Sequence, residues 1–439
     1  MRIMTDTEPD MFRKQVPILI RNAWINGKLQ EMYLEDGKIS AIGEKITDHD
    51  AEFIIDADKA TALPGMINMH THAAMELLRG YADDMQLFEW LSTKIWPTEA
   101  HLSDYDFYIG VKLACLEMIR TGTTAFNDMY FGIEHEARAV DEMGIRACLQ
   151  YGFIDGGSHE KFESESRITQ EAVTHIRKLN NPRIIPAVSP HAVYTVSEEG
   201  LRWCAEYAAK ENLLLHIHVS ETEQEVKDCV EAHGMRPPKW LEKCGVLSNR
   251  CIAAHSCYLD ADDISLYAKY GVTAVNNPVS NMKLAGGRAI PYNELKAAGV
   301  NVALGTDGAS SNNALDMFTE MKTAAVLQKF YWKDPTAMPA ADALKMATEN
   351  GAKALGIHAG VLAPGYLADV ILVGRNPSTV PRFNAESNAV YATSGMAVTT
   401  TICNGEILMH DGFIPGAEEI MDEAEKAAFA LTERAKAAM

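Results

Sequence analysis

Between about residues 63 and 355, short apolar runs alternate with stretches in which apolar residues recur at helical spacing. The apolar runs have the length and composition of buried parallel strands, and each stretch between them is long enough for a crossover connection. Eight such strands alternating with helices predict a (β/α)8 barrel, with an open doubly wound sheet as the main alternative. The strands are expected near 63–69, 123–128, 145–152, 183–189, 213–219, 250–255, 272–276 and 301–306, and the helices include 104–120, 197–210, 222–233, 260–270, 291–299, 314–330 and 341–355.

Both ends of the chain show a different pattern, with short apolar strands separated by Asn-Gly or Asp-Gly pairs. These pairs stand at 26–27, 36–37, 404–405 and 411–412, and they are typical of tight β-hairpins. Neither end alone has enough strands for a stable sheet, so we expect both to build one small β-sandwich beside the barrel. The predicted division is 1–62 and 364–415 for the two parts of the sandwich, 63–363 for the barrel, and 416–439 for a terminal helix.

Composition narrows the class of protein. A formal net charge of −20 argues against nucleic acid and anionic membrane surfaces as partners. No apolar run approaches the ~20 residues of a membrane span, and the N-terminus lacks the apolar segment of a secretory signal. The eight cysteines form no C-x-x-C pair, which indicates reduced, buried thiols and a cytoplasmic protein. No glycine-rich phosphate-binding motif follows a strand, so nucleotide-phosphate binding has no support.

Histidines and one aspartate stand where predicted strands end, which is where barrels of this kind carry their active sites. Residues i and i+2 of a strand face the same way, so the two histidines of a His-x-His motif can reach one metal ion. The residues at these ends are His70 and His72, His191, His216 and His218 with Glu221, His255, and Asp307.

Three imidazoles and one carboxylate around an open position form the usual ligand set of a catalytic zinc ion. We therefore expect His70, His72, His218 and Asp307 to bind one Zn²⁺, and the same ligands would also accept Fe²⁺ or Mn²⁺. His216 lies on the same strand face as His218 and competes for the ligand role, although it is one pleat deeper.

At these motifs the chain resembles the amidohydrolase superfamily, in its mononuclear adenosine-type deaminase branch. The similarity extends from about residue 17 to 412 and is closest to 5′-methylthioadenosine/S-adenosylhomocysteine deaminases of the archaeal 5′-deoxyadenosine deaminase type. It implies zinc-dependent conversion of a 5′-modified adenosine to its inosine and ammonia, in a homo-oligomer such as a tetramer. The motifs are PGMINMHTH (64–72), RTGTTAFNDMYF (120–131), HIHVSET (216–222), AAHS (253–256), NPVSNMKLAGG (277–287) and LGTDGASSNN (304–313).

The resemblance also implies a role for each matching residue. Glu221 would protonate the purine ring at N1 and then pass a proton to the leaving ammonia. His255 would orient the attacking water, and Asp307 would accept a proton from that water besides binding the metal. Glu99 would accept a ribose hydroxyl, and His191 would contact the substrate. Residues 87–90 and Trp96 are expected either to line the pocket near the 5′ substituent or to be part of the hydrophobic core.

The sequence departs from the family at two positions. Asn276 stands where relatives have a histidine, and Tyr151 aligns with an arginine that helps to hold the larger substrate's carboxylate. Arg167 aligns with a second such arginine. Loss of a cation weakens the case for S-adenosylhomocysteine and favours small 5′ groups.

Three other functions stay open on the sequence alone. Deamination of guanine and hydrolysis of a substituted triazine would use the same metal ligands. The third is a metal-free scaffold. It is the least favoured, because such a protein would be expected to have lost metal ligands. A binuclear amidase would need a bridging lysine after the fourth strand, and residues 183–193 contain none.

Overall fold

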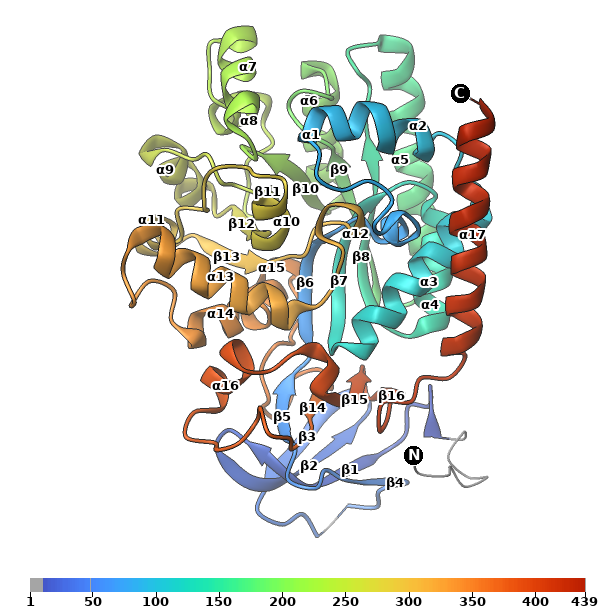
Figure 1. Ribbon diagram of the computed structural model, residues 1–439, viewed down its shortest axis with the longest axis vertical. Coiled ribbons are helices and arrows are strands. Elements are labelled where there is room, and N and C mark those ends of the chain that lie inside the picture. Colours follow the sequence, from blue (N-terminus) through green and yellow to red (C-terminus); the bar gives the residue numbers. More distant parts are fainter. Residues whose placement is uncertain (1–10, 48, 439) are drawn as a thin grey trace.

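The computed structural model describes residues 11–47 and 49–438, and its larger part is a barrel of parallel strands surrounded by helices (Figure 1). Every pairing between neighbouring barrel strands is parallel. The first and last strands meet where the backbone N–H of Asp307 donates to the carbonyl oxygen of His70 at 2.8 Å. This closure confirms the (β/α)8 barrel and excludes the open sheet. In order around the barrel the strands are β6 (Met66–Thr71), β7 (Thr123–Tyr130), β8 (Arg146–Phe153), β9 (Ile184–Pro190), β10 (Leu214–Val219), β11 (Cys251–His255), β12 (Thr273–Asn276) and β13 (Asn301–Leu304).

Helices connect the strands and cover the barrel. Side-chain caps fix several helix starts, among them capping boxes at Ser103 and Asp260. The helix expected over 341–355 is two helices, because Thr348 leaves helical geometry between them. The barrel-associated helices are η2 (Ala73–Leu78), α1 (Leu87–Trp90), η3 (Leu91–Ile95), α2 (Trp96–Glu99), α3 (Asp104–Arg120), α4 (Ile133–Met143), α5 (His159–Leu179), α6 (Glu198–Glu211), α7 (Glu223–His233), α8 (Pro237–Cys244), α9 (Ala261–Tyr270), α10 (Pro278–Lys283), α11 (Tyr292–Ala297), α12 (Ala309–Asn312), α13 (Met317–Trp332), α14 (Ala340–Met346) and α15 (Glu349–Leu355).

Strands from both ends of the chain form one mixed sheet below the barrel in Figure 1, as predicted for the smaller domain. Strand β5 joins the two parts, because it pairs antiparallel with β14 and parallel with β1. The Asn-Gly and Asp-Gly turns have positive φ at both residues, the geometry of tight hairpins. Strand β5 belongs to this sheet and ends at Pro64, close to the predicted limit between residues 62 and 63. The limits of the two domains stay predictions. The strands are β1 (Ile18–Ile25), β2 (Lys28–Glu35), β3 (Lys38–Gly43), β4 (Phe53–Asp56), β5 (Thr61–Pro64), β14 (Val370–Val373), β15 (Val398–Cys403) and β16 (Glu406–Met409), with the short helices α16 (Ala385–Tyr391) and η4 (Gly395–Ala397) between β14 and β15.

The C-terminal helix α17 (Ala417–Ala438) runs along the side of the barrel against α3 (Figure 1). Its buried residues follow helical spacing on one stripe, as expected for a helix that covers an apolar surface. None of the described helices combines the length and apolarity needed to cross a membrane. All eight cysteines are buried, and none of them forms a disulfide bond.

Candidate active site

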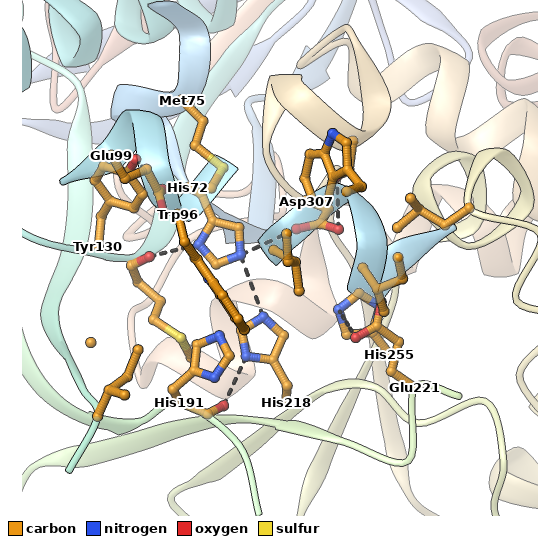
Figure 2. A pocket seen from close by; sticks show the side chains of 18 of the residues that line it. His72, Met75, Trp96, Glu99, Tyr130, His191, His218, Glu221, His255 and Asp307 are labelled. Atoms are coloured by element: carbon orange, nitrogen blue, oxygen red, sulfur yellow. Dashed lines mark hydrogen bonds and ion pairs between the residues drawn. The ribbon is translucent and has the colours of Figure 1, made fainter. Parts of the chain in front are cut away.

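A cavity of about 770 Å³, partly open to solvent, lies at the carboxyl ends of the barrel strands. Figure 2 shows the predicted polar residues pointing into it from several different strands and loops. Apolar side chains from the segment 87–96 and from β7 complete the wall. The predicted residues that line it are His72, Glu99, His191, His218, Glu221, His255 and Asp307.

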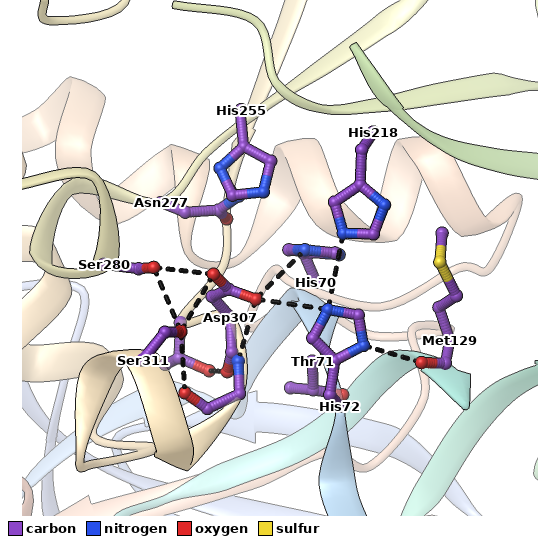
Figure 3. A network of polar contacts seen from close by, with 12 residues as sticks. His70, Thr71, His72, Met129, His218, His255, Asn277, Ser280, Asp307 and Ser311 are labelled. Carbon is purple, nitrogen blue, oxygen red and sulfur yellow. Dashed lines mark hydrogen bonds and ion pairs between the residues drawn. The ribbon is translucent and has the colours of Figure 1, made fainter. Parts of the chain in front are cut away.

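The four expected metal ligands converge at the base of this cavity (Figure 3). Asp307 Oδ1 lies 3.3 Å from Nε2 of His70 and 3.3 Å from Nε2 of His72. The Nε2 atoms of His72 and His218 are 3.4 Å apart. His70 Nε2 is buried and makes no hydrogen bond. His70 belongs to two groups with converging ligand atoms, one with His72 and His218 and the other with His255 and Asp307. Three imidazoles and a carboxylate arranged in this way fit a zinc ion.

Backbone carbonyls hold two of these imidazoles in the ligating tautomer. His72 Nδ1 donates to the carbonyl oxygen of Met129 at 2.7 Å, and His218 Nδ1 donates to that of His191 at 2.8 Å. Because Nδ1 carries the proton in both rings, each Nε2 keeps its lone pair for a metal.

His216, the competing residue on β10, is placed behind the cluster. Its Nε2 lies 3.1 Å from His70 Nδ1, and the amide nitrogens of Asn127 and Gln150 each lie 3.0 Å from its Nδ1. Both of its nitrogens therefore have partners away from the cavity. This arrangement favours His218 as the ligand from this strand.

Asp307 is fixed through its second oxygen. The hydroxyls of Ser280 and Ser311 donate to Oδ2 at 2.6 and 3.0 Å, while Oδ1 faces the histidines. Asp307 has a φ of 67°, and strained backbone of this kind is common at functional sites. Burial would raise the pKa of this carboxyl, but contacts with His70 and His72 hold the pKa well below its usual value. Asp307 is therefore an anion.

Glu221 and His255 face each other beside the cluster, with Oε2 and Nε2 3.9 Å apart. The carboxylate of Glu225 accepts hydrogen bonds from the backbone N–H groups of Ser220 at 2.8 Å and Glu221 at 2.7 Å. This clamp fixes the turn that carries Glu221. Burial raises the pKa of Glu221 above its usual value, which favours a protonated carboxyl able to act as an acid.

Glu99 and His191 are the two predicted substrate contacts. Glu99, at the end of α2, is half-buried and accepts a 2.5 Å hydrogen bond from the hydroxyl of Tyr130. Burial raises the pKa of Glu99. His191 follows β9, its Nδ1 lies 2.9 Å from the hydroxyl of Thr195, and burial lowers its pKa to about 3. His191 is therefore neutral and can donate or accept one hydrogen bond within the cavity.

The positions that depart from the family lie outside the cavity. The hydroxyl of Tyr151 donates to Glu165 at 3.3 Å. Arg167 is exposed on α5 and borders a surface groove instead. Asn276 is buried at the end of β12, and its amide nitrogen has no hydrogen-bond partner. Along the described chain, no lysine or arginine lines the cavity.

Several supporting residues were missed by the sequence reasoning. Ser280 and Ser311 hold Asp307, Tyr130 holds Glu99, and Glu225 holds the turn before α7. Only Glu225 had a local signal, since Thr222 and Glu225 have the spacing of a helix capping box. The others act across the fold, so their partners are not visible from local spacing.

The sequence profile described as the amidohydrolase family matches residues 61–408, and the chain belongs to this family. A 5′-deoxyadenosine deaminase of Methanoregula boonei is 56% identical over 437 residues, which cover 98% of this chain and 99% of that protein. The 5-methylthioadenosine/S-adenosylhomocysteine deaminase 1 of Archaeoglobus fulgidus is 46% identical over 94% of this chain and 96% of that protein. The crystal structure of an adenosine deaminase from Xanthomonas campestris with bound zinc has a TM-score of 0.89 and 32% identity, covering 95% of this chain and 98% of that one.

A buried carboxyl beneath the site gives a pH-dependent prediction. Glu320 accepts hydrogen bonds from Asn312 at 2.6 Å and from the backbone N–H of Val279 at 3.3 Å, and burial raises its pKa to about 8. Between pH ~4.5 and ~8 the unfolded chain releases this proton while the folded chain keeps it, so stability falls as pH rises. Relative to Glu320→Gln, the wild-type free energy of unfolding should fall by up to about 1.4 kcal/mol per pH unit in this range. Denaturant unfolding at several pH values measures it, and a constant difference would contradict the assignment.

Proposed function

We propose that this protein is a zinc-dependent hydrolase that releases the 6-amino group of 5′-substituted adenosines as ammonia. The observation that carries the proposal is the pair Glu221 and His255, which lies beside the four-ligand cluster and inside the same cavity. The high identity to deaminases named for 5′-deoxyadenosine and 5-methylthioadenosine supports the substrate class. The same similarity favours this function over guanine deamination or triazine hydrolysis.

Each residue has a defined part in the reaction. Bound at His70, His72, His218 and Asp307, zinc supplies Lewis acidity that lowers the pKa of water. Asp307 accepts a proton from the attacking water, and His255 orients that water toward C6. Glu221 donates a proton to N1, then takes the proton of the new C6 hydroxyl and delivers it to the amino group, which leaves as ammonia. The proton that Asp307 took from the water replaces the one that Glu221 gave to N1. Water and the nucleoside are thereby converted to the inosine analogue and ammonia.

The other polar groups bind the sugar. The carboxylate of Glu99 accepts a ribose hydroxyl, and neutral His191 makes a second polar contact. The hydrogen bond from Tyr130 keeps Glu99 turned into the cavity (Figure 2).

Apolar side chains form the wall of the cavity, and they are Leu87, Trp90, Leu91 and Trp96. Phe88 contacts the ring of Tyr194 instead. This apolar wall suits a small 5′ group.

Selectivity for the 5′ group is the first test of this arrangement. Since no lysine or arginine lines the cavity in the described chain, the carboxylate of S-adenosylhomocysteine would lose hydration without gaining a cationic partner. We expect kcat/KM for 5′-deoxyadenosine to exceed that for S-adenosylhomocysteine by at least about tenfold, equivalent to ~1.4 kcal/mol. Steady-state ammonia release measures both values. Comparable kcat/KM values for the wild-type protein would overturn the selectivity.

An assay panel tests the substrate class as a whole. The zinc-loaded protein is given adenosine, 5′-deoxyadenosine, 5′-methylthioadenosine, S-adenosylhomocysteine, guanine and a chlorotriazine. Ammonia release from the 5′-deoxy nucleosides at rates well above those for guanine is the expected result. Activity confined to guanine, or chloride release from the triazine alone, would replace the proposal with the corresponding alternative. Absence of both bound metal and activity would favour the scaffold.

We further propose that the protein is cytoplasmic and forms a homo-oligomer, with a tetramer as the expected state. Eight buried, unbridged cysteines support a reducing compartment. Exposed aromatic side chains at Phe330, Phe383 and Phe429 support contacts between copies. Light scattering on the purified protein gives the mass, and a monomer at micromolar concentration would contradict the oligomer.

A further inference from the structure

The ring of His255 is held from the side opposite the cavity. Its Nδ1 lies 2.8 Å from Oδ1 of Asn281, a residue of the short helix α10 that no step of the proposed reaction uses. His255 is almost fully buried, and its backbone is left-handed with a φ of 66°. Its Nε2 is the nitrogen that faces Glu221.

The orientation of the Asn281 amide is fixed independently of His255. Its nitrogen donates to the sulfur of Cys257 at 3.1 Å, so the oxygen is the end that meets the imidazole. A carbonyl oxygen only accepts, and therefore Nδ1 of His255 must carry the proton. Neutral His255 then has its lone pair on Nε2.

A second amide supports the same tautomer. Asn277 satisfies both ends of its side chain when the amide nitrogen donates to the carbonyl oxygens of Gly305 and Asn276, at 3.3 Å each. In that orientation its oxygen is the atom that lies 3.3 Å from His255 Nδ1. The Nδ1–H group of His255 then faces two amide oxygens, which can only accept. In the opposite tautomer the Nδ1 lone pair would face both oxygens without a proton between them.

We propose that Asn281 is a positioning residue that holds His255 in the Nδ1–H tautomer and so presents the Nε2 lone pair to the reacting water. This inference rests on the deaminase function proposed above. Asn281 acts only through His255 and does not line the cavity. Loss of its oxygen would remove the shorter of the two contacts to Nδ1–H, 2.8 Å against 3.3 Å for Asn277, and would leave room for the ring to turn and misplace Nε2.

Two substitutions at Asn281 and one elsewhere test the role. Asn281→Leu keeps the volume and removes the acceptor, so kcat should fall at least about tenfold with KM changed less than about twofold. Asn281→Asp keeps an acceptor and should stay within about fivefold of wild type. Asn301→Leu is the matched control, since Asn301 is another amide whose nitrogen donates within the barrel, to Thr273 and Asn350. The Asn301→Leu substitution should lower the melting temperature and leave kcat unchanged. Bound zinc should stay stoichiometric in all three.

Two further measurements separate positioning from a general structural role. In a His255→Gln background, Asn281→Leu should add less than a twofold loss, because the residue through which it acts is gone. Ring ¹⁵N spectra of the zinc-loaded protein should show His255 as the Nδ1–H tautomer, and Asn281→Leu should change that signature. Equal losses from Asn281→Leu in both backgrounds, or an Nε2–H tautomer in the wild type, would overturn the inference. The spectra remain decisive even if no adenosine is deaminated, which would refute the proposed function separately.

Discussion

Replacing Glu221 with glutamine will leave zinc bound and the fold intact while lowering kcat by about 10² to 10⁴-fold, the usual contribution of a general acid–base group. The amide keeps the shape of the side chain but cannot deliver a proton to N1 or carry one to the amino group. Partial burial raises the pKa of Glu221, which favours the protonated carboxyl that this role needs. Steady-state kinetics with 5′-deoxyadenosine, together with metal analysis, measures the effect.

Glu223→Gln is the matched control for this substitution. Glu223 is two residues away, exposed in the first turn of α7, and paired with Lys227 at 3.1 Å. Its replacement should change kcat by less than about twofold, because exposed ion pairs contribute little. A Glu221→Gln enzyme with near wild-type turnover would show that another group moves the proton.

Replacing His218 with alanine will abolish stoichiometric zinc binding and lower kcat/KM by at least about 10³-fold. Three ligands would remain, but the site would lose the imidazole whose Nε2 faces that of His72. Without the metal, the water that attacks C6 keeps its pKa of about 15.7 instead of about 7. Metal content of the purified variant and its activity with added zinc measure both effects.

His216→Asn provides the comparison, because His216 stands two residues earlier on the same strand. It contacts His70 from behind, so its loss should weaken zinc binding by about 10 to 100-fold without removing the site. Retained stoichiometric zinc in His218→Ala and its loss in His216→Asn would reverse the assignment of the two histidines.

The barrel and the convergence of the candidate metal ligands could be predicted because their signals are local. A His-x-His pair at a strand end places both side chains on one face, and closed barrels bring all strand ends together. His70, His72, His218, His255 and Asp307 therefore converge from the ends of four strands, as expected. The paired hairpin signals at the two ends of the chain likewise predicted one shared domain, which β5 and β14 join.

The residues that orient the site could not be predicted in the same way. Asn281 reaches His255 from a helix after the next strand, and Ser280 reaches Asp307 across β12 and β13. Such contacts depend on distances between neighbouring strands and on the direction of short loops, and neither follows from hydrophobic periodicity. The choice between His216 and His218 also needed the structure, since alternation places both on one face.

The central claim is hydrolytic removal of the 6-amino group of a 5′-substituted adenosine. It is tested most directly by incubating the zinc-loaded protein with 5′-deoxyadenosine in ¹⁸O-labelled water and analysing the products by mass spectrometry. We predict one ammonia released for each 5′-deoxyinosine formed, with one ¹⁸O atom on the purine ring. Unchanged 5′-deoxyadenosine from a fully zinc-loaded, folded protein, or cleavage to free adenine, would contradict it.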